Sequence, residues 1–130
     1  MGWFSRKKKE KTKESNSNVN TEINVEESIK KAELLKEELE KYDDSNRVSL
    51  LNEIGEIYYK ISDYDNAVKY YEESLSIEKA LGKPYTNLLN IYNIKRREAA
   101  VNKNDEEIQY YLKKIDDMMK ISKDVIRGNV

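Results

Sequence analysis

Adjacent carboxylates are the residues of this sequence whose type comes nearest to a catalytic site. Such pairs occur at Asp43-Asp44, Glu72-Glu73, Glu106-Glu107 and Asp116-Asp117. Two carboxylates work together as acid and base only when both reach the same substrate. Neighbouring residues on a helix point about 100° apart, so the members of each pair diverge if these segments are helical. We therefore expect all four pairs to be solvated helix surface.

The residue types that are missing limit the remaining chemistry. The sequence has no cysteine and no histidine, which excludes disulfides, Cys/His metal sites and catalysis by either side chain. It also has no phosphate-binding glycine loop, nucleophile elbow or metal-spaced cluster. We therefore expect a protein that is not an enzyme and uses no cofactor. The lack of cysteine fits a reducing cytoplasm, which is the location we expect.

The spacing of apolar residues indicates which elements carry these side chains. The chain has 130 residues, 38% charged and 38% apolar, which suits one domain whose apolar residues share one face of each element. Apolar residues recur at spacings of three and four, predicting helices over about 25–42, 47–61, 65–81, 84–101 and 105–126. The helix starts have capping side chains at Ser45 or Asn46, Ser62 or Asp63, and Asn104 or Asp105. No segment alternates with period two, so the predicted fold class is all-α.

The helical pattern repeats along the chain. When Leu51 is aligned with Tyr85, the same shift places Ile54, Ile57 and Tyr58 on Leu88, Ile91 and Tyr92. After that helix a longer shift is needed, and Val68, Tyr70, Tyr71 and Leu75 fall on Ile108, Tyr110, Tyr111 and Ile115. We therefore expect the second unit to contain six extra residues in its first helix or turn.

The first unit resembles the tetratricopeptide repeat (TPR), a helix-turn-helix unit of about 34 residues. The matching features are Leu51, Ile54-Gly55, Tyr58, Ser62-Asp63-Tyr64, Ala67, Tyr71 and Ser74. The match is strong over 48–81 and degenerate over 82–121, where Leu89, Glu107 and Lys114 replace small residues. The resemblance implies a short right-handed α-α superhelix of antiparallel hairpins: two TPR-like units plus an extra N-terminal helix, over 25–127.

Gly55 has a physical reason in this interpretation. Glycine inside a helix costs about 1 kcal/mol relative to alanine, so close packing must compensate for it. A glycine at this position lets two antiparallel helices approach, while Tyr58 and Tyr71 fill the adjacent space. The alternative is a tolerated glycine on the surface.

The resemblance also implies a binding groove and a non-enzymatic adaptor that holds a peptide or protein. In the family, the inner faces of the first helices line a concave groove. The corresponding residues are Ser49, Asn52, Glu56, Tyr59, Lys60, Lys83, Thr86, Asn90, Asn93 and Ile94. Their asparagine, tyrosine and lysine side chains suit hydrogen bonding to an extended peptide; the alternative is ordinary solvated surface. One family subtype grips a C-terminal carboxylate, which Glu56 would repel, so we do not expect that subtype.

The N-terminus is basic and the remainder acidic. Residues 1–14 carry a net charge of +4 and the rest of the chain −5. We expect residues 1–24 to be a disordered tail followed by a polar linker. Contact with an anionic membrane surface, at the inner face of the cell membrane, would use Trp3, Phe4, Arg6, Lys7, Lys8 and Lys9. The alternatives are a solubilising end and, less favoured because the body is acidic, contact with nucleic acid.

The last helix suggests a second hypothesis for function. Met118, Met119, Ile121, Val125 and Ile126 make it more apolar than a solvated cap should be. This composition favours a structural homo-oligomer, such as a homodimer, that associates through the C-terminal helix.

Overall fold

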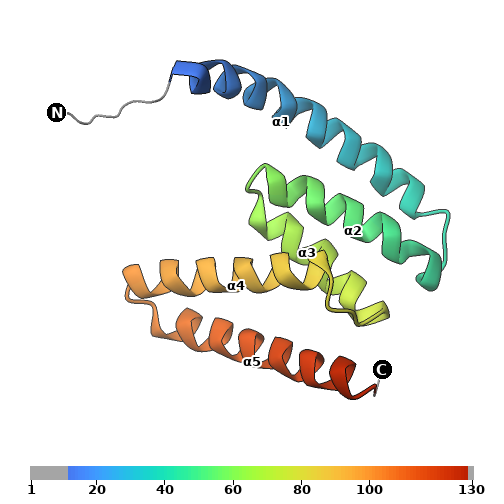
Figure 1. Ribbon diagram of the computed structural model, residues 1–130, viewed down its shortest axis with the longest axis vertical. Coiled ribbons are helices and arrows are strands. Elements are labelled where there is room, and N and C mark those ends of the chain that lie inside the picture. Colours follow the sequence, from blue (N-terminus) through green and yellow to red (C-terminus); the bar gives the residue numbers. More distant parts are fainter. Residues whose placement is uncertain (1–11, 129–130) are drawn as a thin grey trace.

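The computed structural model describes the backbone of residues 12–128 and the side chains from Val25 to Gly128. This part of the chain forms five helices and no strand, so the all-α prediction is confirmed (Figure 1). The helices are α1 (Thr12–Leu39), α2 (Asp44–Lys60), α3 (Tyr64–Ile77), α4 (Lys83–Val101) and α5 (Asp105–Arg127). Helices α2 and α3 form one tight hairpin, and α4 and α5 form another. Helix α1 packs on α2, and α4 packs on both α3 and α2.

Four helix boundaries differ from those predicted by three residues or more. Helix α1 ends at Leu39 rather than at residue 42, and α2 begins at Asp44 rather than at residue 47. The N-cap of α2 is therefore Asp43, and the prediction of Ser45 or Asn46 as its cap was wrong.

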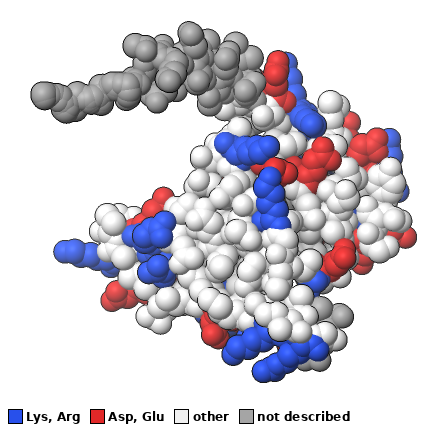
Figure 2. Space-filling model, in the orientation of Figure 1, with Lys and Arg blue, Asp and Glu red and all other residues white. Residues whose placement is uncertain are grey.

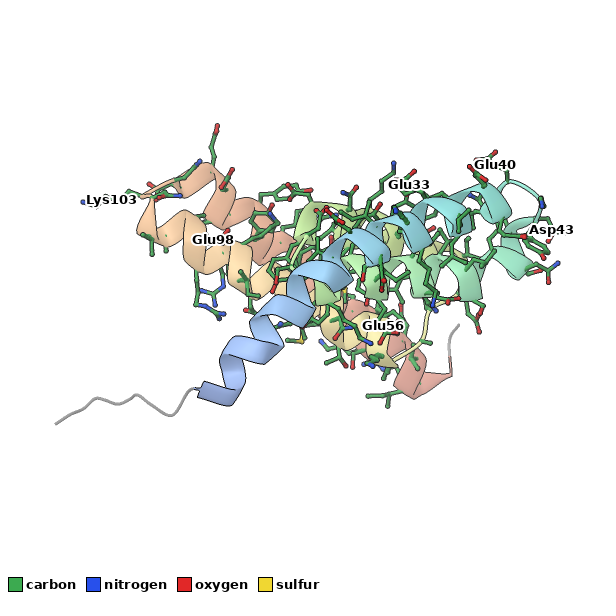
Figure 3. The ribbon with its side chains drawn as sticks, turned by 90° about the horizontal axis from the view of Figure 1, so that it is seen from above. Glu33, Glu40, Asp43, Glu56, Glu98 and Lys103 are labelled. Carbon is green, nitrogen blue, oxygen red and sulfur yellow. The ribbon has the colours of Figure 1, made fainter. Side chains whose placement is uncertain are left out.

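Helix α1 begins at Thr12 rather than near Val25, so residues 15–24, expected to be a linker, are helical. These residues are polar but include no proline or glycine, so nothing stops the helix from extending backward once the packed segment is formed. This N-terminal part projects away from the other helices (Figure 3). Helix α3 ends at Ile77 rather than near residue 81, because Glu78 adopts an extended backbone.

The hydrophobic core runs through all five helices. Its buried residues are Ala32 and Leu39 of α1, Leu51, Ile54 and Tyr58 of α2, Ala67, Tyr70, Tyr71 and Leu75 of α3, Leu88, Ile91 and Tyr92 of α4, and Met118 of α5. The outermost helices α1 and α5 contribute fewest, since each packs on only one side. The cores of the two hairpins are therefore continuous through α3 and α4.

Gly55 lies directly beneath the ring of Tyr71. A Cβ atom at Gly55 would stand 2.7 Å from both Cδ1 and Cε1 of that ring. The Tyr71 side chain is 1% exposed, and its hydroxyl accepts a hydrogen bond from Nδ2 of Asn87 at 3.0 Å. The ring is thus held from both ends, so the predicted close approach of α2 and α3 at Gly55 is confirmed.

The two hairpins turn in the same way. Ser62 and Lys103 are the only non-glycine residues with positive φ in the described chain, at 64° and 57°. Asp63 and Asn104 follow them, and each accepts a hydrogen bond from the backbone N–H three residues later. Asp63 and Asn104 are further apart in the sequence than Leu51 and Tyr85 are, and the difference is seven positions. Helix α4 therefore extends seven residues further past the aligned segment than α2 does, rather than the expected six. Because α4 also begins later, it has 19 residues against the 17 of α2.

The extra residues lengthen α4 at its C-terminal end. The correspondence of α2 with α4 holds earlier in the helices, where Tyr58 stacks on Tyr70 at 6.1 Å and its counterpart Tyr92 packs on Tyr111 at 6.2 Å. The end of α4 and the start of α5 project beyond the first hairpin (Figure 1). Glu98 and Lys103 mark this projecting end in Figure 3.

Candidate functional site

The predicted groove residues of α2 and α4 come together on one surface, which we call the α2–α4 surface. Nζ of Lys83 donates a hydrogen bond to Oε2 of Glu56 at 2.9 Å, beside the start of α4 (Figure 3). One turn further along α2, Nδ2 of Asn90 donates to the hydroxyl of Tyr59 at 2.7 Å. Residues far apart in the sequence therefore share this surface. The alignment of Leu51 with Tyr85 had predicted this, because it gave these residues equivalent positions in two successive units.

Electrostatics on this surface centre on Glu56. Its carboxylate lies 2.9 Å from Nζ of Lys83 and 3.3 Å from Nζ of Lys60. The hydrogen bond from Lys83 is the main reason that the pKa of Glu56 falls below its ordinary value, and Lys60 adds to the effect. One carboxylate between two ammonium groups leaves this end of the surface with a net positive charge.

Tyr59 and Asn90 keep hydrogen-bonding capacity for a ligand. An asparagine amide offers two N–H donors and an oxygen acceptor, and a tyrosine hydroxyl both donates and accepts. Their mutual bond uses one donor of Asn90 and the acceptor side of Tyr59. The amide oxygen of Asn90 has no partner among the described residues, and the hydroxyl hydrogen of Tyr59 remains available to a ligand. A donor and an acceptor side by side match the two polar groups of an extended peptide.

Among the other predicted groove residues, Asn52 and Asn93 use their side chains in hydrogen bonds within the fold. Oδ1 of Asn52 accepts a hydrogen bond from the buried hydroxyl of Ser74, which ties α2 to α3. Asn93 bonds within its own helix, donating to the carbonyl oxygen of Leu89 at 3.1 Å and accepting from Arg96 at 3.3 Å. The side chains of Ser49 and Thr86 are exposed, and that of Ile94 is half-buried.

Two of the four carboxylate pairs diverge as predicted, although Glu72 and Glu73 are half-buried rather than fully solvated. Glu72 accepts a hydrogen bond from Tyr92 and pairs with Lys114, whereas Glu73 pairs with Arg47 on another helix. Asp116 and Asp117 likewise pair with different lysines of α5. Among residues with described side chains, no group of three or more carboxylates could hold a metal ion.

Two polar residues with structural roles were not predicted. Asn87 is buried, and the signal for it was available, because it lies four residues before Ile91 on the apolar face of α4. Lys36 of α1 places its Nζ 5.1 Å from the ring of Tyr58 and 5.6 Å from that of Tyr70. A hydrogen bond with the Tyr58 hydroxyl is the main reason that the pKa of Lys36 is raised. This lysine helps to hold α1 on the first hairpin.

A hollow lies between α3, α4 and α5, away from the α2–α4 surface. It encloses about 230 Å³, and its floor is apolar, formed by Leu75, Leu88, Met118 and Ile121. Its rim carries the paired charges of Glu72 and Lys114. None of the predicted groove residues lines this hollow.

No family model, no curated protein and no solved structure matches the chain. None of the described helices is long and apolar enough to cross a bilayer. Trp3, Phe4, Arg6 and Lys7 to Lys9, predicted for membrane-surface contact, lie outside the described residues.

Charge is distributed unevenly over the visible face. Figure 2 shows acidic and basic side chains mixed along the described part of α1, whereas much of the middle of this face carries no charge. A surface with few basic side chains offers little for a polyanion to bind.

Proposed function

We propose that this protein is a non-enzymatic adaptor of the TPR type, which binds an extended peptide or protein segment on the α2–α4 surface. The observation that supports this best is the meeting of Tyr59 with Asn90 and of Glu56 with Lys83. Polar side chains from the first helices of two successive hairpins then line one surface, as in TPR proteins. The short superhelix implied by the resemblance would make this surface concave.

The chemistry of the surface suggests what it would bind. The open donor of Tyr59 and acceptor of Asn90 suit a peptide backbone, and the two lysines around Glu56 favour an acidic side chain nearby. In the TPR subtype that grips a terminal carboxylate, the position matching Glu56 faces that carboxylate, and a glutamate there would repel it. The proposed ligand is therefore an internal, extended segment with an acidic residue rather than a free C-terminus.

The test is a quantitative comparison of the proteins captured by wild type and by a Tyr59→Ala/Asn90→Ala double variant. Asn52 stays unchanged, because its bond to Ser74 supports the fold. A matched control is Gln109→Ala/Lys113→Ala on the exposed side of α5. Specific partners should be lost with the first variant and kept with the second. If the double variant captures the same specific partners as wild type, the α2–α4 surface is not the site.

A further inference from the structure

Helix α5 carries an exposed apolar stripe that no other described helix covers. Residues 108, 112, 115, 119 and 126 recur at the spacing of one helical face. Leu112, Met119 and Ile126 are the uncovered members, 43%, 48% and 75% exposed. Ile108 and Ile115 are half-buried, and Ile115 also packs against the core. Of the five residues that the sequence indicated for association, Met118 is buried and Ile121 and Val125 are half-buried. The exposed apolar face of α5 therefore lies at a different angle around the helix axis from the face that the sequence indicated.

The first hairpin shows what normally covers this position. The shared turn geometry makes Leu112 the counterpart of Tyr71, since both follow the capping residue by eight positions. Tyr71 is buried because α2 lies beneath it and Asn87 of α4 covers its hydroxyl. Within the described residues no helix follows α5, so Leu112 is left open. Among the described helices α5 lies at the outside, and in repeat folds an outer helix with an apolar face requires a neighbour.

The stripe is complementary to itself in the antiparallel direction. A two-fold axis perpendicular to α5, at the level of residue 117 along the helix, would place Ile108 opposite Ile126 of a second copy. The same axis would place Ile115 opposite Met119. The edge of the stripe is acidic in the first half of α5, at Asp105 and Asp116, and basic in the second half, at Lys120, Lys123 and Arg127. The same antiparallel pairing brings Asp105 toward Arg127 and Asp116 toward Lys120 of the other copy, so opposite charges meet.

The other end of the molecule does not offer such a surface. The outer side of α1 carries Lys30, Glu37 and Lys41, which are exposed and charged, with Leu34 as an isolated apolar residue. A head-to-tail assembly would place the α5 stripe on these charges and leave them desolvated. Pairing of α5 with itself avoids that cost.

We infer that the partner of the α5 stripe is a second copy of this chain, packed through α5 in antiparallel orientation about a two-fold axis. This dimer is separate from the α2–α4 surface and would present two such surfaces at once. The contact is small for a permanent interface, so the dimer should form reversibly at micromolar concentration.

The first test is sedimentation of the full chain from about 1 to about 200 µM, the range in which small interfaces associate. Wild type should shift from monomer to dimer. Met119→Glu should weaken dimerisation about tenfold or more, because the two-fold axis buries the new charge twice. Ile126→Glu should act in the same direction. Leu34→Glu is the matched control, at a leucine on α1 whose exposure of 63% lies between those of Met119 and Ile126, and should dimerise like wild type.

The second test fixes the orientation and uses the absence of native cysteines. A short bismaleimide should cross-link Asp116→Cys to itself, because that position lies beside the proposed axis. It should not cross-link Gln109→Cys to itself, but should join Gln109→Cys to Lys123→Cys when the two are mixed. A strictly monomeric wild type, an unaffected Met119→Glu dimer, or self-cross-linking at Gln109→Cys would each overturn the proposal.

Discussion

At the scale of single residues, Gly55 determines how closely α2 and α3 pack. Alanine there gains about 1 kcal/mol of helix propensity, but its Cβ would stand 2.7 Å from a ring that cannot move freely. We expect Gly55→Ala to lower the free energy of unfolding by about 1 kcal/mol net and Gly55→Leu by about 3 kcal/mol or more. Urea denaturation followed by circular dichroism measures both.

Gly82 provides the control for this prediction. The nearest atom to a Cβ there is Cδ of Pro84 at 3.8 Å, an ordinary contact. Gly82→Ala should therefore cost clearly less than Gly55→Leu, at most about 1 kcal/mol, and through the loss of a favourable N-cap residue of α4 rather than through a clash. A Gly55→Leu variant as stable as wild type would mean that Tyr71 does not cover Gly55.

Glu56 makes the link between α2 and α4 dependent on pH. Its pKa is lowered mainly by Lys83, so folding favours the carboxylate form. The contribution is then present above the ordinary pKa of 4.5 and is lost as the pH falls through the lowered value. Glu56→Gln should cost about 0.5 kcal/mol at pH 7, as surface ion pairs do.

The comparison of wild type with Glu56→Gln across pH 7 to pH 2 checks this sign. The stability difference should shrink toward zero at the acidic end and also in about 1 M salt, which screens the pair. A difference that grows on acidification would contradict the ion-pair interpretation.

At the scale of helices, the starts of α3 and α5 depend on their caps. Asp63 accepts a bond from the backbone N–H of Asn66 at 3.4 Å, and Asn104 from that of Glu107 at 3.2 Å. Asp63→Ala and Asn104→Ala should each cost about 1 kcal/mol. Asp43, at the start of α2, makes no such bond, so Asp43→Ala should cost clearly less. Equal losses for all three, measured by urea denaturation, would show that the caps are not the cause.

The helices themselves were predicted well because apolar periodicity records burial directly. Leu51, Ile54 and Tyr58 lie inside as their spacing required. The start of α1 was missed because residues 12–24 contain only two apolar residues, Val19 and Ile23, too few to form a periodic pattern.

The extension of α4 was predicted as six residues instead of seven, because Tyr71 and Tyr111 look alike in sequence and were aligned. The turns at Ser62 and Lys103 align Tyr71 with Leu112 instead.

The surface was predictable only in part. The alignment of Leu51 with Tyr85 correctly indicated that Glu56 and Tyr59 share a face with Lys83 and Asn90. It could not indicate that Asn52 turns inward to Ser74, because that depends on the separation and rotation of α2 and α3. Periodicity assigns a face to a side chain but not its hydrogen-bond partner.

At the scale of the whole molecule, the basic N-terminal segment remains a prediction about membranes. Binding of Trp3, Phe4 and the following lysines to anionic lipid should be weak, reversible and reduced by salt. Cosedimentation with anionic and neutral vesicles, comparing the full chain with a version starting at Ser15, measures this. If the shortened version binds equally well, or if neither binds at low salt, the segment is not a membrane contact.

The central claim is that the α2–α4 surface holds an extended peptide, and mapping of a bound peptide tests it most directly. A peptide selected from a random library on the wild-type protein would be titrated into isotope-labelled protein, and amide chemical-shift changes recorded. We expect the largest chemical-shift changes around Glu56, Tyr59, Lys83 and Asn90, and loss of peptide binding in the Tyr59→Ala/Asn90→Ala variant. Changes concentrated instead around the hollow at Leu75, Met118 and Ile121, or unaltered binding by the double variant, would contradict it.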